Sequence, residues 1–254
     1  LILMALAGPW LAPYDPESMH FASRFAPPSW EFLLGTDSFG RDLLSRVLVG
    51  ARSTILLALL ATIIGSTVGA LIGLISAYFG GRIDEIIMRI VDAVMAIPGL
   101  LFALLIISAL GSSAINAVIA IGITFAPGMA RVSRSITLTV REQDYVAAAV
   151  ARGEGAAWII LREIAPNILA PVIVESTIRV AFAIMLLATL SFLGMGAQPP
   201  SPEWGLMISD ARAHLYRSPW PVIAPGVAIA TVAVAFNLLG DGLRDVLNPR
   251  VQGG

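Results

Sequence analysis

The chain has 254 residues, of which 57% are hydrophobic and only 13% charged, and its mean hydropathy is +0.84. These values exclude a soluble globular domain and predict an all-α integral membrane protein, a polytopic helical bundle. All 16 basic residues are arginine and cysteine is absent, which excludes disulfides, thiolate chemistry and Schiff-base lysines, and the net charge of −1 gives no basis for binding nucleic acid.

Six membrane spans are predicted in a single domain. A hydrocarbon core of roughly 30 Å needs about 20 apolar residues of helix. Five segments meet this requirement: 54–78, 86–110, 114–130, 168–193 and 222–240. The opening stretch 1–11 is apolar but short, and we interpret it as the outer half of a span whose start is missing. A cleaved signal peptide is the alternative, although no small-residue cleavage site precedes the Pro-rich loop that follows.

The distribution of arginine predicts the orientation. If the polar segment 131–167 lies in the cytoplasm, nine arginines fall on that side of the membrane and six on the other. This bias has the sign of the positive-inside rule. It places segments 12–52 and 195–221 outside and both termini inside, including a tail at 241–254.

One span carries a stripe of small residues. Ala61, Gly65, Gly69, Gly73 and Ala77 recur every fourth residue, so that they lie along one side of a helix. Small side chains let a second helix approach closely, and the stripe therefore predicts helix packing.

Prolines and charges interrupt the apolar segments. Pro98 and Pro127 each free a carbonyl and kink a helix, and such a kink either lines a pathway or is a plain structural bend. Glu175 and Arg179 lie four residues apart in one span. Glu85, Arg89 and Asp92 lie at i, i+4 and i+7, on one face of a helix at the cytoplasmic end of another span. Either these charges neutralise one another inside the bundle, or they border a water-filled cavity that a polar solute crosses.

Two outer segments are predicted to be surface elements. Residues 41–48, RDLLSRVL, place their apolar side chains on one face of a helix and their polar side chains on the other, which predicts an amphipathic helix lying on the membrane. Segment 195–221 contains a Gln-Pro-Pro turn and two tryptophans at positions typical of interfacial anchors. Both segments either receive an external partner or are solvated loops. The candidate contacts for a partner are Gln198, Pro199, Pro200 and Trp204.

The sequence contains no motif of an ATPase or hydrolase. A phosphate-binding loop requires a lysine, which this chain lacks, so that any ATP that drives it is bound by another chain. Neither H-E-x-x-H nor G-x-S-x-G occurs. The two histidines, His20 and His214, have no neighbour at the spacing of metal ligands.

Residues 141–167 predict a helix–turn–helix at the membrane surface. The run YVAAAVA (145–151) has high helix propensity and small side chains. Gly153 and Gly155 permit a sharp turn, an apolar stripe beginning at Trp158 predicts a second short helix, and Pro166 suits the first turn of the next span. The product is slim enough to enter a cleft in a partner, although packing alone does not distinguish it from a linker.

This segment resembles the EAA loop of ABC-importer permeases. The motifs GTDSFGRDLLSR (35–46), AYFGGRIDEIIMRIVDAVMAIPG (77–99), LSFLGMGAQPP (190–200) and AFNLLGDGLRDVLNPR (235–250) extend the resemblance over nearly the whole chain. Together they are similar to the C-type permease subunit of dipeptide, oligopeptide and nickel importers. The chain departs from the family pattern where the EAA glutamate is Ala147, the usual arginine Val150, the usual leucine Arg152 and a commonly basic position Glu163.

The resemblance implies a type I ABC importer transmembrane fold with cytoplasmic coupling helices, in a multi-pass protein of the bacterial inner membrane. It implies a second homologous permease, two ATP-binding subunits that hold ATP and Mg, an extracytoplasmic solute-binding protein, and no cofactor or catalytic residue in this chain. The ATPase-coupling residues would be Tyr145, Ala148, Ala149, Arg152, Gly153, Glu154, Gly155, Pro166 and Asn167. The candidate residues lining the translocation path are Asp92, Pro98, Glu175 and Arg179.

The substrate class that the resemblance favours is peptides, with nickel complexes or haem as alternatives. Two rival classes are a secondary transporter, which would typically show an internal repeat with broken helices, and an intramembrane enzyme. No such repeat is evident, and the spans offer no candidate base other than a carboxylate.

Overall fold

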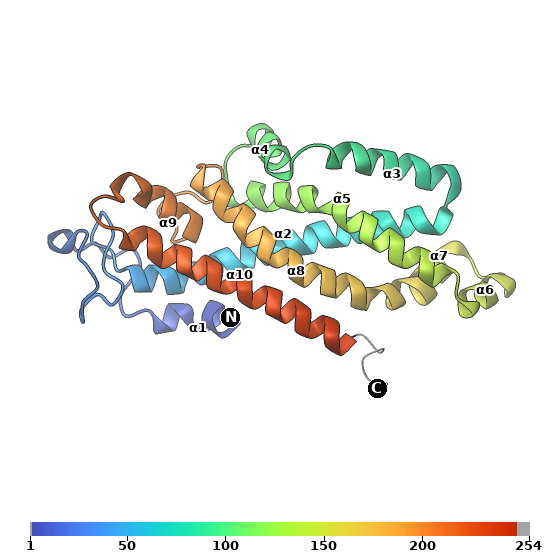
Figure 1. Ribbon diagram of the computed structural model, residues 1–254, viewed down its shortest axis with the longest axis horizontal. Helices are drawn as coiled ribbons and strands as arrows, with labels where there is room; N and C mark the ends of the chain where they lie inside the picture. Colours follow the sequence, from blue (N-terminus) through green and yellow to red (C-terminus); the bar gives the residue numbers. More distant parts are fainter. Residues whose placement is uncertain (1, 248–254) are drawn as a thin grey trace. The chain divides into compact units, whose positions relative to one another are not determined.

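The computed structural model describes residues 2–247, most of which are helical (Figure 1). The helices are α1 (Ile2–Leu11), α2 (Leu43–Phe79), α3 (Gly81–Met95), α4 (Gly99–Leu110), α5 (Ala114–Arg141), α6 (Asp144–Ala151), α7 (Ala156–Trp158), α8 (Ala165–Phe192), α9 (Trp204–Ala211) and α10 (Trp220–Leu247). A π-helical turn, Ile159–Ile164, joins α7 to α8. Between residues 2 and 247 there is no β-strand, only one isolated bridge, so the all-α prediction is confirmed.

Within residues 2–247, four helices are long and apolar enough to cross a membrane: α2, α5, α8 with the turns before it, and α10. They coincide with the predicted spans 54–78, 114–130, 168–193 and 222–240, although α2 begins earlier and α5 continues further. The tail predicted at 241–254 is helical as far as Leu247, and its remainder lies outside the described residues.

The predicted span 86–110 is broken. Helices α3 and α4 meet at an angle of 90° across a gap of three residues, and only together do they meet the length and hydropathy of a span. Pro98 occupies the gap, where it cannot donate a backbone hydrogen bond, and the residue before a proline is disfavoured in a helix. The expected kink is therefore a complete interruption.

By contacts the chain divides into two compact units. Unit 1 comprises Leu1–Leu60, Leu104–Ile119 and Val180–Phe236, and unit 2 comprises Ala61–Ala103, Ala120–Arg179 and Asn237–Gly254. Each unit is assembled from segments that lie far apart in the sequence.

In unit 2 the small-residue stripe of α2 packs directly on α5. A Cβ added to Gly65, Gly69 or Gly73 would lie only 2.7, 2.3 or 2.2 Å from a backbone carbonyl oxygen of α5. Ala61 and Ala77, at the ends of the stripe, are fully buried. The packing interpretation of this stripe is confirmed, because the two backbones approach more closely than any side chain would allow.

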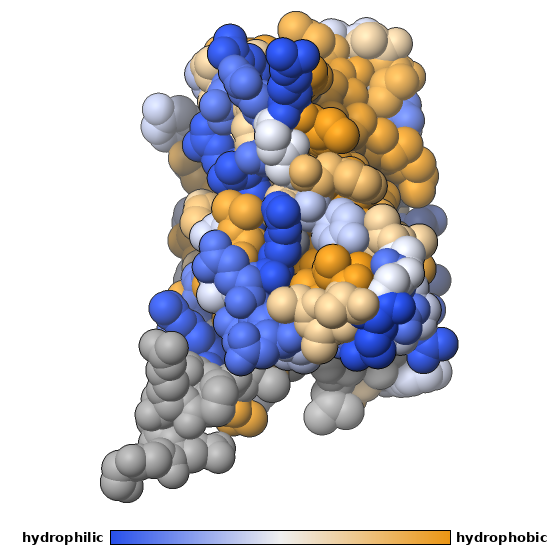
Figure 2. All heavy atoms as spheres, turned by 90° about the vertical axis from the view of Figure 1, so that its right-hand side faces the viewer, coloured by the Kyte–Doolittle hydropathy of each residue, from blue (hydrophilic) through white to orange (hydrophobic). Residues whose placement is uncertain are grey.

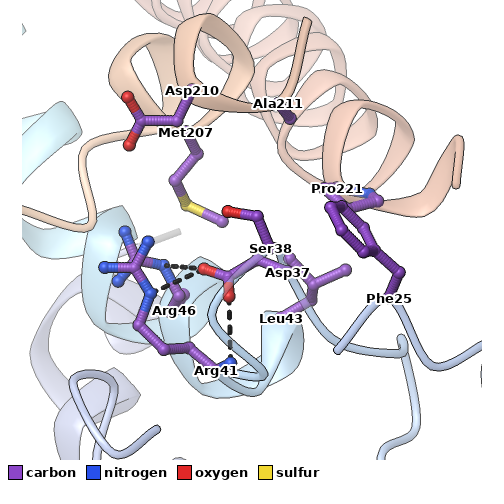
Figure 3. A pocket seen from close by; sticks show the side chains of 10 residues that line it. All are labelled: Phe25, Asp37, Ser38, Arg41, Leu43, Arg46, Met207, Asp210, Ala211 and Pro221. Carbon is purple, nitrogen blue, oxygen red and sulfur yellow. Dashed lines mark hydrogen bonds and ion pairs between the residues drawn. The ribbon is translucent and has the colours of Figure 1, made fainter. Parts of the chain in front are cut away.

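In unit 1 the first turns of α2 are covered by the segment that precedes them. Asp42 caps α2 by accepting hydrogen bonds from the backbone N–H and hydroxyl of Ser45, at 2.8 and 2.6 Å. Figure 3 shows Arg41 and Arg46 converging on the carboxylate of Asp37, with Nε–Oδ2 distances of 2.6 and 3.8 Å. Arg46 is 2% exposed and also donates to the carbonyl of Pro16.

These contacts correct the prediction for residues 41–48. The helix does not lie on the membrane with a solvated polar face, because its polar residues are buried within unit 1. An amphipathic pattern requires only that the two faces meet different environments, and here the polar face meets a charged protein interior.

Trp204 also lies inside unit 1, so its prediction as an interfacial anchor is wrong. Its side chain is fully buried, and the indole N–H donates to the carbonyl of Val47 at 3.0 Å. The preceding residue, Glu203, caps α9 by accepting from the backbone N–H groups of Gly205 and Leu206. Burial raises the pKa of this carboxyl group.

Candidate functional site

Helices α6 and α7 and the π-helical turn form a compact element, which we call the surface module (residues 144–164). The turn between its helices depends on Gly153, whose φ of +82° disfavours other residues. The N–H of Gly153 donates to the carbonyl of Val150, and the N–H of Glu154 donates to that of Ala149. These bonds close α6 with the pattern of a glycine C-cap, at the position where the sequence predicted a turn.

The module has its own hydrophobic core in unit 2. Val146 and Ala149 of α6 are buried with Ile159 and Ile164 of the π-helical turn, together with Leu74 of α2 and Ile168 of α8. Ala149 is fully buried in this cluster, whereas Ala148 is exposed. The expectation that Ala149 lies against a partner is therefore wrong, because its side chain faces the interior of this chain.

Charged groups link the two halves of the module. The guanidinium of Arg152 lies 3.7 Å from the Glu154 carboxylate and 3.6 Å from that of Glu163, and it also lies over the Trp158 ring. Burial and the Glu163 carboxylate raise the pKa of the Tyr145 phenol, which favours its neutral form. Two of the departures from the family pattern, Arg152 and Glu163, therefore contact each other.

Large apolar side chains of the module remain exposed. Val150 and Leu161 are 58% and 65% exposed, and Tyr145 and Trp158 are each 39% exposed. We call Tyr145, Ala148, Val150, Trp158 and Leu161 the outer residues of the module. The remaining predicted coupling positions Gly155, Pro166 and Asn167 are exposed as well.

The candidate path residues form two separate ion pairs in unit 2. Asp92 of α3 pairs with Arg131 of α5 at 2.6 Å, and both side chains are at least half exposed. Glu175 and Arg179 of α8 pair with each other at 2.9 Å and are mostly buried. Pro98 lies exposed in the break between α3 and α4.

Arg179 is accommodated by a glycine on α5. A Cβ at Gly128 would lie 3.2 Å from the guanidinium nitrogen Nη1, so the absence of a side chain leaves room for this charge. The Nε of Arg179 is buried without a hydrogen-bond partner. This pair supports the neutralisation interpretation for residues 175 and 179.

A charged groove lies between α3 and α5. Its lining residues are Gly81, Asp84, Glu85, Met88, Arg89, Asp92, Arg131 and Arg134, and its volume is about 670 Å³. Arg134 binds both carboxylate oxygens of Asp84, which also accepts from Ser76, and Glu85 pairs with Arg89 at 2.6 Å. The sequence analysis did not identify Asp84, Arg131 or Arg134 as site residues, since their partners lie 39 and 50 residues away.

The outer candidate contacts separate into exposed and buried residues. Gln198, Pro199 and Pro200 are exposed, and the Gln198 amide donates to the carbonyls of Gly194 and Gly196. Trp204 is buried, and the structure removes it from the candidate contacts because it presents no surface to a partner.

Together these features define a class of protein: a multi-pass helical membrane protein with a broken span, a charged groove and a helical module carrying exposed apolar side chains. Residues 69–253 match the family described as "Binding-protein-dependent transport system inner membrane component". The chain belongs to this family.

Several relatives are similar over almost the full length of the chain. The di/tripeptide transport system permease protein DppC of Pseudomonas aeruginosa is 42% identical over 99% of this chain and 85% of its own length. The dipeptide transport system permease protein DppC of Haemophilus influenzae is 40% identical over 98% and 87%. The glutathione transport system permease protein GsiD of Escherichia coli is 42% identical over 100% and 84%. These matches confirm the resemblance to C-type permeases.

A solved structure shares the fold. An inward-facing form of the MetNI methionine ABC transporter superposes with a TM-score of 0.65 at 15% sequence identity, covering 80% of this chain and 96% of the matched chain. This similarity confirms the predicted ABC importer transmembrane fold.

Proposed function

We propose that this chain is the membrane-spanning permease subunit of an ATP-driven importer of peptides. The names of its relatives support this substrate class, since they describe permeases for dipeptides, tripeptides and glutathione. The chain lacks lysine and with it a phosphate-binding loop. In this proposal it is not an enzyme and binds no cofactor, and two separate ATPase subunits hold ATP and Mg.

The surface module is the element that we propose to couple this chain to an ATPase subunit. Its interior is filled by its own residues together with Leu74 of α2 and Ile168 of α8, whereas Val150 and Leu161 remain exposed within the described chain. On the side of the molecule that Figure 2 shows, exposed hydrophobic residues lie next to hydrophilic ones. An apolar surface of this kind is typical of a protein interface. The outer residues, with Arg152, Gly153, Glu154, Gly155, Pro166 and Asn167, would contact or shape the contact with an ATPase subunit.

The remaining partners follow from the same proposal. A second homologous permease completes the translocation path, to which Asp92, Pro98, Glu175 and Arg179 contribute. An extracytoplasmic solute-binding protein delivers the peptide and contacts Gln198, Pro199 and Pro200. Closure of the ATPases on ATP moves the coupling modules, and the cavity opens alternately to the two sides.

Charge placed on the outer residues is expected to abolish uptake. Val150→Arg or Leu161→Arg puts a guanidinium at a position buried by the ATPase, where an unpaired charge costs about 3 kcal/mol or more, a loss of affinity of about a hundredfold. Because both side chains are exposed in this chain, the subunit should still fold. Co-purification of the ATPase and ATP-dependent dipeptide uptake by the complete transporter measure the effect.

Thr139→Arg is the matched control, since it adds the same charge at an exposed site in the last turn of α5, outside the module. Unchanged uptake in both module variants, at equal amounts of protein, would show that residues 144–164 are only a linker. Peptide uptake that continues in the complete transporter after ATP is removed would favour a secondary transporter instead.

Single-cysteine labelling tests the orientation, in which 131–167 and both termini are cytoplasmic. The chain contains no cysteine, so Ser201→Cys and Gly155→Cys each introduce one reactive thiol. An impermeant maleimide added to intact cells should label position 201 and leave position 155 unlabelled. Permeabilised cells, in which both sites must react, provide the control. Labelling of Gly155→Cys in intact cells would reverse the orientation and remove the module from the ATPase side.

A further inference from the structure

We propose that the groove between α3 and α5 binds the two charged ends of a short peptide. The inference rests on the proposed function and adds a specific site to it. The site consists of two ion pairs, Glu85 with Arg89 and Asp92 with Arg131, in which the carboxylate side chains would take the peptide ammonium and the guanidinium groups its carboxylate.

The groove must face water or a polar ligand rather than lipid. The side chains of both ion pairs are at least half exposed, and they lie on α3 and α5 at or near the predicted ends of membrane-spanning segments, with Arg89 and Asp92 inside the predicted span 86–110. Exposed charges in hydrocarbon are costly, and α3 separates its faces accordingly. Ile83, Ile86 and Ile90 are exposed on another stripe of the helix. That stripe suits lipid, and the charged one suits an aqueous pathway.

The groove is built so that some charges are fixed and others are free to exchange. Asp84 accepts hydrogen bonds from Nε and Nη2 of Arg134 and from the Ser76 hydroxyl, and its side chain is mostly buried. It ties α3 to α5 and to α2. The pairs Glu85–Arg89 and Asp92–Arg131 make one close contact each and keep hydrogen-bonding capacity, since a guanidinium carries five donors.

The dimensions match a dipeptide or tripeptide. The separation of the two ion pairs follows from their carboxylate members on α3. Glu85 and Asp92 are seven residues apart, which is about 10 Å along an α-helix. Two or three extended residues span about 7–11 Å. The groove volume of about 670 Å³ lies within the range of small-ligand sites, roughly 300–1,000 Å³, so side chains of different size can be accommodated. Recognition of the peptide ends alone would therefore tolerate many sequences.

Photocrosslinking in the complete transporter tests this site. The assembly of both permeases and both ATPases, in nanodiscs of phosphatidylethanolamine and phosphatidylglycerol, is irradiated with a dipeptide that has free termini and a diazirine side chain. Adducts are expected on residues 81–92 and 131–134. Dialanine should protect these residues, whereas N-acetyl-dialanine amide, which lacks both charges, should not.

The double variant Asp92→Asn with Arg131→Gln removes one exposed pair without changing the net charge. It should raise the dialanine concentration needed for half protection about tenfold, as expected for a lost charge-assisted hydrogen bond. The control is Asp241→Asn with Arg244→Gln, which removes the same charges from exposed positions of α10 outside the groove. It should leave protection unchanged.

The proposal would be overturned by adducts only outside the groove, by equal protection by the blocked peptide, or by no effect of the groove variant. A zwitterionic lipid headgroup has similar charges, so labelling is repeated in phosphatidylglycerol alone. Unchanged labelling is expected, and a several-fold rise would assign the groove to phosphatidylethanolamine. If the wild-type transporter imports dialanine with ATP but the groove is unlabelled, only this inference fails. Absence of peptide uptake would instead contradict the proposed function.

Discussion

Replacing Gly69 and Gly73 together by alanine should leave little folded subunit. A Cβ at these positions would lie 2.3 and 2.2 Å from the carbonyl oxygens of Ala126 and Ala130. Backbone atoms cannot rotate away as a side chain can, so α2 and α5 must separate. Overpacking commonly costs about 1–3 kcal/mol per site, and we expect at least about 3 kcal/mol for the pair.

The matched control is Gly226→Ala on α10, where an added Cβ would meet nothing within 4 Å. Alanine has the higher helix propensity, so this variant should be neutral or more stable by up to about 1 kcal/mol. The midpoint of thermal denaturation in detergent, followed by size-exclusion chromatography, compares the variants. If Gly69→Ala with Gly73→Ala melts at the temperature of the control, then α2 does not pack on α5 through its glycines.

Removing either partner of the Glu175–Arg179 pair should strongly lower stability, whereas removing both should restore part of the loss. The pair is mostly buried in a span, and Arg179 has one guanidinium nitrogen already without a partner. Glu175→Gln leaves that cation unneutralised, which costs about 2–4 kcal/mol for a group with this partial exposure. Glu175→Gln with Arg179→Gln removes both charges, and the two amides can still form a hydrogen bond.

A double-mutant cycle on the thermal stability of the assembled transporter measures the coupling energy. We expect about 1–2 kcal/mol for residues 175 and 179. The control cycle uses Glu85 and Arg89, which have the same spacing and charges but are largely exposed, and should give no more than about 0.5 kcal/mol. Losses that simply add at residues 175 and 179 would contradict neutralisation and favour separate roles in the solute path.

The sequence predicted those features that depend on local pattern. The composition predicted the class of protein, and the four-residue spacing of glycines predicted the face of α2 that packs on α5. Gly153 predicted the turn of the surface module. Each of these depends on one residue type at one spacing, so no knowledge of distant contacts is needed.

Features that depend on distant partners were missed. Hydrophobic periodicity separates two faces of the helix at residues 41–48, but it does not show that Arg46 on the polar face meets the carbonyl of Pro16, 30 residues earlier, rather than water. Ala148 and Ala149 are adjacent and chemically identical, and only the position of Ile159 and Ile164 distinguishes the buried one. Likewise, the groove depends on a contact between Asp92 and Arg131, 39 residues apart.

The length of α2 has a consequence for the bilayer. From Ser53 to Phe79 the helix has 27 residues without a charge, about 40 Å, which exceeds a hydrocarbon core of roughly 30 Å. This hydrophobic mismatch is relieved most simply by tilt. Because the glycine stripe fixes how α2 lies on α5, packing rather than membrane thickness sets the direction of that tilt. A thicker membrane would therefore reduce the mismatch without altering the helix pair.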